Sequence, residues 1–245
     1  MATRINKYLG EHGYCSRREA DRLLRAGSVF VNGKRANLGD QVEETDRVEV
    51  LGRRPRATAP EKIYLLLNKP PGYITTTDRN SDNTVMDLVP RANRVFPVGR
   101  LDVASCGLLL MTNDGDLALK LTHPRYEHDK EYEVTVDKPI GDAHLRVLAE
   151  GVMLDEKKTL PAKVKRLGSR EFSITLREGR NRQIRRMCDE LGYAVTRLQR
   201  VRVMSLLLGN LQEGKHRALT TQEIAALKKE TSAPPRPAPE VGGTA

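Results

Sequence analysis

The stretch VFPVGRLDVASCGLLLMTNDG, residues 95–115, joins two apolar runs through a short polar connection. Short apolar runs bounded by glycine and turn residues predict buried strands. Asp102 lies in the connection, so a carboxylate is expected between two core strands. On residue type alone, Asp102 is more often a turn residue or an ion-pair partner than a catalytic group. After the second run, Asn113, Asp114 and Gly115 predict a turn into a helix, with Asp114 placed to cap it.

Outward from this stretch, residues 61–230 alternate short β-rich runs with a few helical ones. We expect strands at 64–68, 94–98, 107–112, 131–136, 162–166, 171–176 and 201–208. We expect helices at 116–122, 140–150, 180–191 and 221–229. Because strands outnumber helices and do not alternate with them strictly, the sequence predicts a mixed α+β domain and not a doubly wound nucleotide-binding fold.

A separate small α/β module is predicted over residues 1–52. A helix within 4–13 ends near Gly13, and a second helix begins at Ser16, which forms a capping-box pattern with Glu19. Strands at 29–31, 34–36 and 47–50 follow, the first two joined by an Asn-Gly hairpin turn. Arginines of the second helix share the side opposite its apolar residues, which fits either a solvated face or a surface that binds RNA. They are Arg18, Arg22 and Arg25.

Two segments lack the pattern of a folded core. Residues 53–60, RRPRATAP, are basic and proline-containing and predict a linker. Residues 231–245 hold four prolines and two glycines and predict a disordered tail. Residues 61–230 therefore constitute the larger predicted domain.

Composition narrows the kind of partner. The 245-residue chain has 42 Lys and Arg against 32 Asp and Glu, a net charge of +10 that favours a polyanion, with nucleic acid ahead of membrane. No run of 18 apolar residues and no signal peptide is present, so we expect a cytoplasmic protein. Three cysteines without a CxxC pair and five scattered histidines argue against disulfides and metal sites. Glycine-rich nucleotide motifs are missing, so no ATP, NAD or S-adenosylmethionine site is expected.

Five ordered motifs resemble one enzyme family. GRLDVASCGLLLMTNDG (99–115) is similar to the signature of the pseudouridine synthases of the A-type branch, which includes an enzyme of the small ribosomal particle, with Ser105 at its hydroxyl position and Met111 replacing an aliphatic residue. The stretches at 66–76 (LLNKPPGYITT), 130–139 (KEYEVTVDKP) and 179–203 fit the same branch. SRREADRLLRAGSVFVNGKRA (16–36) resembles the S-four RNA-binding domain. Within the branch, the chain looks most similar to its F-type members, which act on RNA of the large ribosomal particle.

The resemblance implies a mainly antiparallel sheet with flanking helices and a reaction that needs no cofactor. It implies that Asp102 is the catalytic aspartate, Tyr132 the active-site tyrosine and Arg185 the arginine that pairs with the aspartate. On the helix at 180–191, Arg182, Arg185 and Arg186 are expected on one side, and Lys69 is expected to contact phosphate. The candidate RNA-binding residues are Arg17, Arg18, Arg22, Arg25, Lys34, Arg35, Arg100, Arg180, Arg182 and Arg186.

The resemblance further implies site-specific isomerisation of uridine to pseudouridine in structured RNA by a monomer. The expected substrate is 23S ribosomal RNA or a precursor ribosomal particle, with transfer RNA as a second substrate. The sequence alone leaves three alternatives: a sister ribosomal RNA synthase, an RNA methyltransferase and a non-enzymatic S-four factor. The methyltransferase would need a glycine-rich loop that the chain lacks. The binding factor has no use for an Asp102, Tyr132 and Arg185 set.

Overall fold

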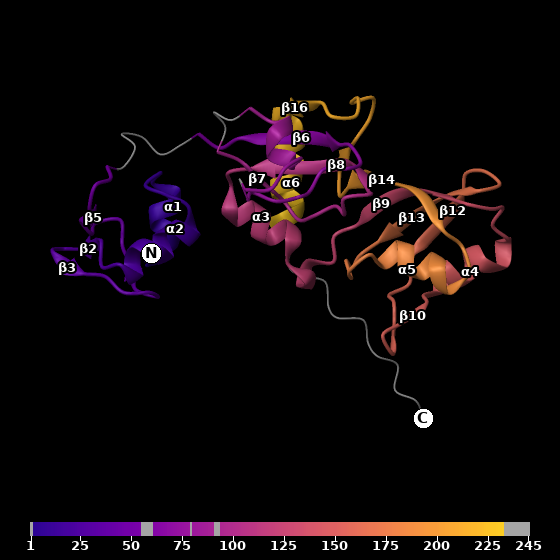
Figure 1. Ribbon diagram of the computed structural model, residues 1–245, viewed down its shortest axis with the longest axis horizontal. Coiled ribbons are helices and arrows are strands. Elements are labelled where there is room, and N and C mark those ends of the chain that lie inside the picture. The colour runs from indigo at the N-terminus through magenta and orange to yellow at the C-terminus, as the bar shows by residue number, and fades with distance from the viewer. Residues whose placement is uncertain (1, 55–60, 79, 91–93, 233–245) are drawn as a thin grey trace. The chain divides into compact units, whose positions relative to one another are not determined.

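The computed structural model describes residues 2–54, 61–78, 80–90 and 94–232 (Figure 1). The chain divides into two compact units, Met1–Glu61 and Lys62–Ala245. Of the predicted linker and tail, residues 55–60 and 233–245 lie outside the described residues. Thr231 and Ser232, which we assigned to the tail, belong instead to the last helix, because the Thr231 side chain is buried and its hydroxyl donates to the Leu227 carbonyl.

The N-terminal unit packs two helices against a small sheet around a core that includes Ile5, Leu9, Ala20, Leu24 and Val29. Its three-stranded antiparallel sheet has the order β3-β2-β5. The short β1 and β4 pair with each other and were not predicted, because two-residue strands have no readable period. The elements are β1 (Thr3–Arg4), α1 (Ile5–Glu11), α2 (Arg17–Arg25), β2 (Val29–Val31), β3 (Lys34–Arg35), β4 (Gln41–Val42) and β5 (Val48–Val50).

Local sequence signals explain the turns of this unit. The Ser16 hydroxyl accepts a hydrogen bond from the Glu19 amide at 3.2 Å, which caps α2 as predicted. The Glu19 carboxylate does not complete the capping box. It pairs with Arg53 at 2.7 Å and with Arg22 at 3.2 Å. Asn32 and Gly33 have φ values of 50° and 77°, the left-handed pair that a two-residue hairpin turn requires.

The C-terminal unit is built on one nine-stranded sheet, whose main path has the order β12-β13-β9-β14-β8-β6-β16. Every pairing in this sheet is antiparallel except that of β14 with β8. The strands are β6 (Tyr64–Lys69), β7 (Phe96–Pro97), β8 (Cys106–Thr112), β9 (Lys130–Val136), β12 (Lys163–Arg166), β13 (Glu171–Leu176), β14 (Val195–Val203), β15 (Leu206–Leu207) and β16 (His216–Ala218). A separate hairpin joins β10 (Met153–Leu154) and β11 (Lys157–Lys158).

Helices cover the two ends of this sheet separately (Figure 1). One hydrophobic cluster lies where α4 (Asp142–Glu150) and α5 (Gln183–Glu190) pack beside β9, β13 and β14. Another lies where α3 (Gly115–Thr122) and α6 (Thr221–Ser232) pack beside β6 and β8, and α3 is capped by Asp114 as predicted. Short 3-10 turns, η1 (Val85–Leu88) and η2 (Pro124–Tyr126), complete the unit. The predicted mixed α+β class with a mainly antiparallel sheet is confirmed. No helix of the described residues is long and apolar enough to span a membrane.

The sequence misplaced several boundaries. The strand expected at 201–208 begins at Val195, and a turn at Met204, with φ 52°, separates its end from β15. Residues 195–200 (VTRLQR) are apolar only at positions 195 and 198 and lack the alternation of a strand, so the pattern did not indicate one there. The helix expected at 180–191 begins at Gln183, because Arg182 adopts a left-handed φ of 47°. The strand expected at 94–98 is only Phe96–Pro97, and β16 was not predicted.

Candidate active site

A cavity of about 760 Å³ opens in the C-terminal unit beside the junction of β8 and β14. Its wall includes Asp102 and Ser105 from the loop before β8, Tyr132 from β9 and Arg200 from β14. Segments far apart in the sequence therefore supply one site. Apolar contributions come from Leu101, Leu108, Ile184 and Leu198, among other residues, and the cations are Arg100, Lys130, Arg177, Arg180, Arg182 and Arg200. A cavity of this kind fits an anionic ligand with a flat apolar portion.

Asp102 is held by its backbone while its carboxylate is left unengaged. The Asp102 carbonyl accepts a hydrogen bond from the Ser105 amide at 3.0 Å, and the neighbouring Val103 carbonyl accepts one from Gly72 at 2.8 Å. Within the part of the chain that the structure describes, no donor bonds or pairs with the half-buried Asp102 carboxylate. The carboxylate is therefore available to a ligand in the cavity.

Lys69 fixes the loop that carries Asp102. Its side chain is fully buried, and its ammonium donates to the carbonyls of Ser105 at 2.8 Å, Pro70 at 3.0 Å, Asp102 at 3.2 Å and Val103 at 3.3 Å. Burial lowers the pKa of Lys69 to about 8. The predicted phosphate contact of Lys69 is wrong, because an ammonium enclosed by four carbonyls cannot reach RNA.

Arg185 reaches the same loop from α5. It is buried, with 8% of its surface exposed, and it donates to the carbonyls of Ala104 at 3.0 Å and Val195 at 2.9 Å. Its Nε is buried without a hydrogen-bond partner. Burial lowers the pKa of Arg185, the nearby Arg182 charge adds to this, and the Asp102 carboxylate opposes it. The expected direct pair with Asp102 is not formed among the described residues, and Arg185 contacts the backbone two residues after it instead.

Burial of Arg185 also corrects our assignment of the helix faces. Arg182 precedes the helix and is exposed, and Arg186 is half-buried and pairs with Asp155 at 2.6 Å. The three arginines therefore do not form one solvent-facing row. The reason is that the helix starts three residues later than predicted and packs deeply enough to cover the side chain at 185.

Tyr132 lies in the cavity wall as expected. In the sheet it is opposite Ile174 of β13 and Arg200 of β14, so its ring has an apolar neighbour on one side and a cation on the other. It packs against the hydrophobic clusters on both sides of the cavity. A ring held in this way offers a flat surface to a planar group.

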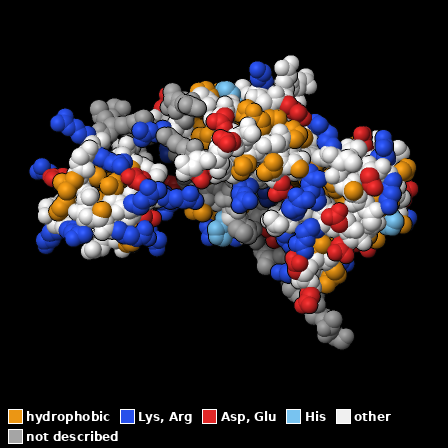
Figure 2. Space-filling model, viewed as in Figure 1, with side chains coloured by type: hydrophobic (Ala, Val, Ile, Leu, Met, Phe, Trp, Pro, Cys, Tyr) orange, Lys and Arg blue, Asp and Glu red, His pale blue; other side chains and the backbone are white. Residues whose placement is uncertain are grey.

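The candidate RNA-binding residues divide into four groups. Arg100 and Arg182 are exposed and line the cavity. Arg180 lines it too, but its guanidinium is taken up by Glu178 and by the carbonyls of Lys157 and Lys158. Arg186 lies outside the cavity lining. The remaining six are exposed on the N-terminal unit, at the left of Figure 2, where many Lys and Arg side chains lie on the visible surface. They are Arg17, Arg18, Arg22, Arg25, Lys34 and Arg35.

Sequence reasoning missed three cations of the cavity wall, Lys130, Arg177 and Arg200. It also gave no reason for the buried Ser105 hydroxyl, which has no hydrogen-bond partner. Lys130 lies two residues before Tyr132 in the motif KEYEVTVDKP, which could have drawn attention to it. Arg200 carried no signal, because it was assigned to a segment before the predicted strand.

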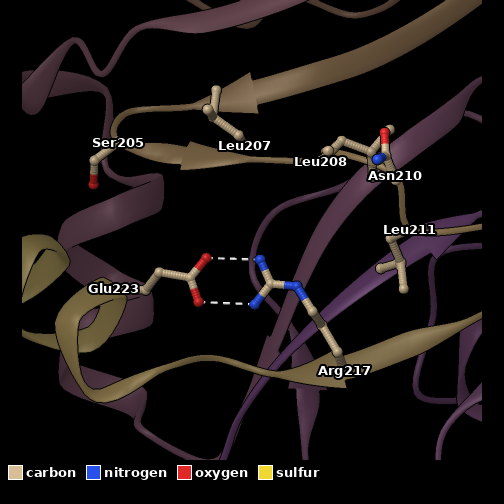
Figure 3. Close-up of a pocket in the computed structure, with 8 residues that line it drawn as sticks. Ser205, Leu207, Leu208, Asn210, Leu211, Arg217 and Glu223 are labelled. Atoms are coloured by element: carbon tan, nitrogen blue, oxygen red, sulfur yellow. Dashed lines mark hydrogen bonds and ion pairs between the residues drawn. The ribbon is translucent and has the colours of Figure 1, made fainter.

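A shallower hollow of about 420 Å³ lies between β15 and the start of α6 (Figure 3). Its two charged residues, Arg217 and Glu223, face each other and form a two-bonded pair at 2.8 and 2.7 Å. Hydrogen bonding to Arg217 lowers the pKa of Glu223 to about 2. Since both charges are satisfied, the hollow lacks a group free to react, and the larger cavity is the candidate site.

Metal chemistry has no support in the described residues, which contain no group of three or more His, Cys, Asp or Glu able to hold an ion. What the cavity offers is a carboxylate on a rigid loop, a tyrosine ring and several cations. Such a set can bind a negatively charged substrate and use the carboxylate as nucleophile or base.

Comparison with known families agrees with this arrangement. Residues 63–190 match the RNA pseudouridylate synthase family, and residues 3–48 match the S4 domain. The first match spans Asp102, Tyr132 and Arg185. The second covers most of the N-terminal unit.

Individual relatives extend over nearly the whole chain. The dual-specificity RNA pseudouridine synthase RluF of Salmonella typhi is 47% identical over 93% of this chain and 79% of its own length. The ribosomal large subunit pseudouridine synthase B of Bacillus subtilis is 41% identical over 92% of this chain and 95% of its own. A crystal structure of a pseudouridylate synthase superposes with a TM-score of 0.68 at 31% identity, covering 91% of this chain and 99% of that one.

Proposed function

The chain belongs to the RNA pseudouridylate synthase family, and from that premise we propose that it converts a specific uridine of 23S ribosomal RNA to pseudouridine, with Asp102 as the catalytic residue. The enzyme class, RNA pseudouridine synthase, follows from the family itself. One observation carries the assignment of the site. Asp102 lines the cavity on a loop whose backbone is fixed by hydrogen bonds, and its carboxylate has no partner among the described residues.

The chemistry needs such a group. The reaction breaks the bond between N1 of uracil and the ribose, turns the base and rejoins it through C5. An ionised carboxylate can attack the substrate or remove a proton from it, and among the described residues no hydrogen bond or ion pair of the Asp102 carboxylate would have to break first. A target uridine must also leave its stack, which costs a few kcal/mol, and the basic wall offsets this through phosphate contacts.

Tyr132 and Arg185 act beside Asp102 in this proposal. The Tyr132 ring stacks on the extruded uracil, and its hydroxyl lies where it can take part in a proton transfer. Arg185 is a positioning residue, since it holds the Ala104 carbonyl and thereby the loop. Arg182 and Arg100 at the cavity contact phosphate, as do the exposed basic residues of the N-terminal unit.

The RNA substrate rests on the relatives. One has the large ribosomal subunit in its name, and the name of another states dual specificity, which supports a second RNA, such as a transfer RNA, as an additional substrate. We further propose a cytoplasmic monomer that acts on the RNA or on a precursor particle. The residues that line the cavity belong to the C-terminal unit.

Asp102→Asn tests the catalytic assignment. The amide keeps the shape of the side chain but removes its charge, so RNA affinity should stay within a few-fold while turnover falls at least about a thousandfold, equivalent to roughly 4 kcal/mol in the barrier. Asp116→Asn, an exposed substitution in the first turn of α3, is the matched control and should keep full activity. Turnover by Asp102→Asn above a thousandth of the wild-type rate would falsify the assignment.

Mapping pseudouridine in ribosomal and transfer RNA from cells that lack the protein tests the substrate. We expect loss of pseudouridine at a 23S position and its return when the wild-type protein, but not Asp102→Asn, is supplied. Loss only from transfer RNA or from RNA of the small ribosomal particle would refute the 23S proposal while leaving the enzyme class intact.

A further inference from the structure

Two cations of the cavity wall are buried or half-buried and still have no acidic partner among the described residues. Lys130 begins β9 and Arg200 lies in β14, the strand paired with β9. No ion pair is formed by either side chain with any residue of the described ranges. Buried or half-buried cations are ordinarily paired, because removing a charge from water is costly.

Sheet geometry brings these two cations together. Arg200 lies directly opposite Tyr132, and directly paired residues of neighbouring strands have their side chains on the same face. Lys130 precedes Tyr132 by two residues and therefore shares that face. Both cations line the same cavity as Asp102. They lie next to the ring that we assign to uracil stacking.

Arg200 is held rigidly in place. Only 5% of its surface is exposed, and its Nε donates to the Leu108 carbonyl at 2.8 Å. This bond leaves the two terminal nitrogens of the guanidinium without a partner among the described residues. A fixed guanidinium with free terminal donors is the geometry that binds phosphate or carboxylate oxygens well.

Three acids near Lys130 and Arg200 pair with other cations. Asp129 pairs with Arg177 at 3.1 Å, and Glu131 pairs with Arg202 at 2.8 Å. Glu178 pairs with Arg180 at 3.1 Å. Asp102 and Glu127 also line the cavity, but among the described residues neither carboxylate forms an ion pair with Lys130 or Arg200.

The excess of positive charge at this wall also affects the pKa of Lys130. Burial lowers its pKa, the neighbouring Arg200 charge lowers it further, and Asp129 acts against both. Two like charges kept together at a partly dry wall raise the free energy of the unliganded protein. An anionic ligand that enters the cavity would remove this cost.

We propose that Lys130 and Arg200 form a receptor for one backbone phosphate of the substrate RNA, next to the uridine that reacts at Asp102. The inference rests on the proposed function for the identity of the anion. A phosphodiester has the single negative charge and the two free oxygens that an ammonium and a guanidinium can share. The receptor fixes the strand on one side of Tyr132 and so sets how far the extruded base enters the cavity.

A cycle that combines a protein change with an RNA change tests the receptor. The probe is a 23S-derived stem–loop that the wild-type protein binds, in which each phosphate flanking the target uridine is replaced in turn by an uncharged methylphosphonate. At one of these positions the wild-type affinity should fall at least about tenfold, the usual worth of a charged hydrogen bond. Lys130→Met should bind the normal RNA more weakly than the wild-type protein by a similar factor. Its affinity should not fall further when the methylphosphonate RNA is used.

Lys138→Met is the matched control. Lys138 is exposed, lies over the Tyr193 ring at 5.2 Å and does not line the cavity. This variant should respond to the methylphosphonate as the wild-type protein does. If Lys130→Met fails to fold, Lys130→Gln provides the same removal of charge, and the salt slope of binding should drop by about 0.7 for the one lost contact.

A receptor role and a purely structural role differ in their effect on stability. Because Lys130 has no ion-pair partner in the described part of the chain, Lys130→Met should melt no lower than the wild-type protein.

Three results would overturn the receptor: equal methylphosphonate losses in the wild-type and Lys130→Met proteins, a marked loss of stability, or lost turnover with unchanged affinity. The last would make Lys130 a proton-transfer group instead. Failure of the proposed function gives a different signature, namely a wild-type protein that binds the RNA without forming pseudouridine. The binding cycle can still be read in that case.

Discussion

Arg185 shapes the site through two carbonyls, those of Ala104 and Val195, which belong to the Asp102 loop and to β14. Lysine at this position keeps the charge but cannot span both acceptors with a planar fork. Arg185→Lys should therefore reduce the maximal rate by ten- to a hundredfold with little change in RNA affinity, measured by single-turnover kinetics. Arg186→Lys, which alters a surface pair with Asp155, should behave like wild type. The reverse result would place the functional arginine one residue later.

Lys69 makes protein stability depend on pH in a definite direction. Its pKa of about 8 in the folded protein lies below the ordinary 10.5, so between these values the unfolded chain holds a proton that the folded protein has released. Between about pH 8 and 10.5 the free energy of unfolding therefore rises with pH by about 1.4 kcal/mol per pH unit because of this group. The stability gained in this way is lost again as the pH falls toward 8.

Lys69→Met removes this dependence along with the four bonds to the loop. The difference in unfolding free energy between the wild-type and Lys69→Met proteins should grow between pH 8 and pH 10, as measured by urea titration. A constant difference would show that the folded protein does not lower the pKa of Lys69. Lys62→Met, at a half-exposed lysine 3.9 Å from Asp114, is a control that should show no such trend.

At the scale of elements, the junction of β8 and β14 depends on Gly107. Its φ is 104°, and a Cβ at this position would overlap the Arg200 carbonyl of the adjacent strand. Gly107→Ala should therefore destabilise the C-terminal unit by at least about 2 kcal/mol and reduce activity. The cost of the strained backbone at this φ adds to the cost of pushing β8 away from β14. Gly115→Ala at the start of α3 meets no atom within 4 Å and should be neutral or slightly stabilising. Equal melting temperatures for the two variants would contradict the close approach.

Strong local patterns made most elements predictable. The apolar run of β8, the Ser16 and Asp114 caps and the Asn-Gly turn each depend on neighbours in sequence, and the structure has them as expected. The resemblance supplied Asp102, Tyr132 and Arg185, but these assignments remain predictions. No local pattern revealed that Lys69 donates to three carbonyls 33 to 36 residues away, or that Arg200 reaches Leu108 across 92 residues. Such contacts arise from the topology of the sheet.

At the scale of the whole molecule, the two units should have separable roles. The N-terminal unit has its own core, and the cavity lies wholly within the other. Deletion of residues 1–61 removes twelve Lys and Arg and nine Asp and Glu, together with six candidate RNA-binding residues. The remaining unit should fold, require more RNA for half-maximal rate and keep a maximal rate within about tenfold of the full chain.

Salt dependence gives the sharper readout for this deletion. Each lost phosphate contact should reduce the slope of log affinity against log salt by about 0.7 to 0.9. An unchanged slope would show that the N-terminal arginines do not touch RNA. A folded fragment without activity at any RNA concentration would show that the first unit contributes to the site itself.

The pairing of β8 with β14 also has a consequence for biosynthesis. The hydrogen bond from Arg200 to the Leu108 carbonyl joins residues 92 positions apart. A ribosome that adds about 5–20 residues per second needs roughly 5 to 20 seconds to synthesise the segment between them. A nascent chain thus displays the basic N-terminal unit well before its cavity can close. A translation product that stops before residue 195 would lack β14 altogether, and it would occupy RNA without modifying it.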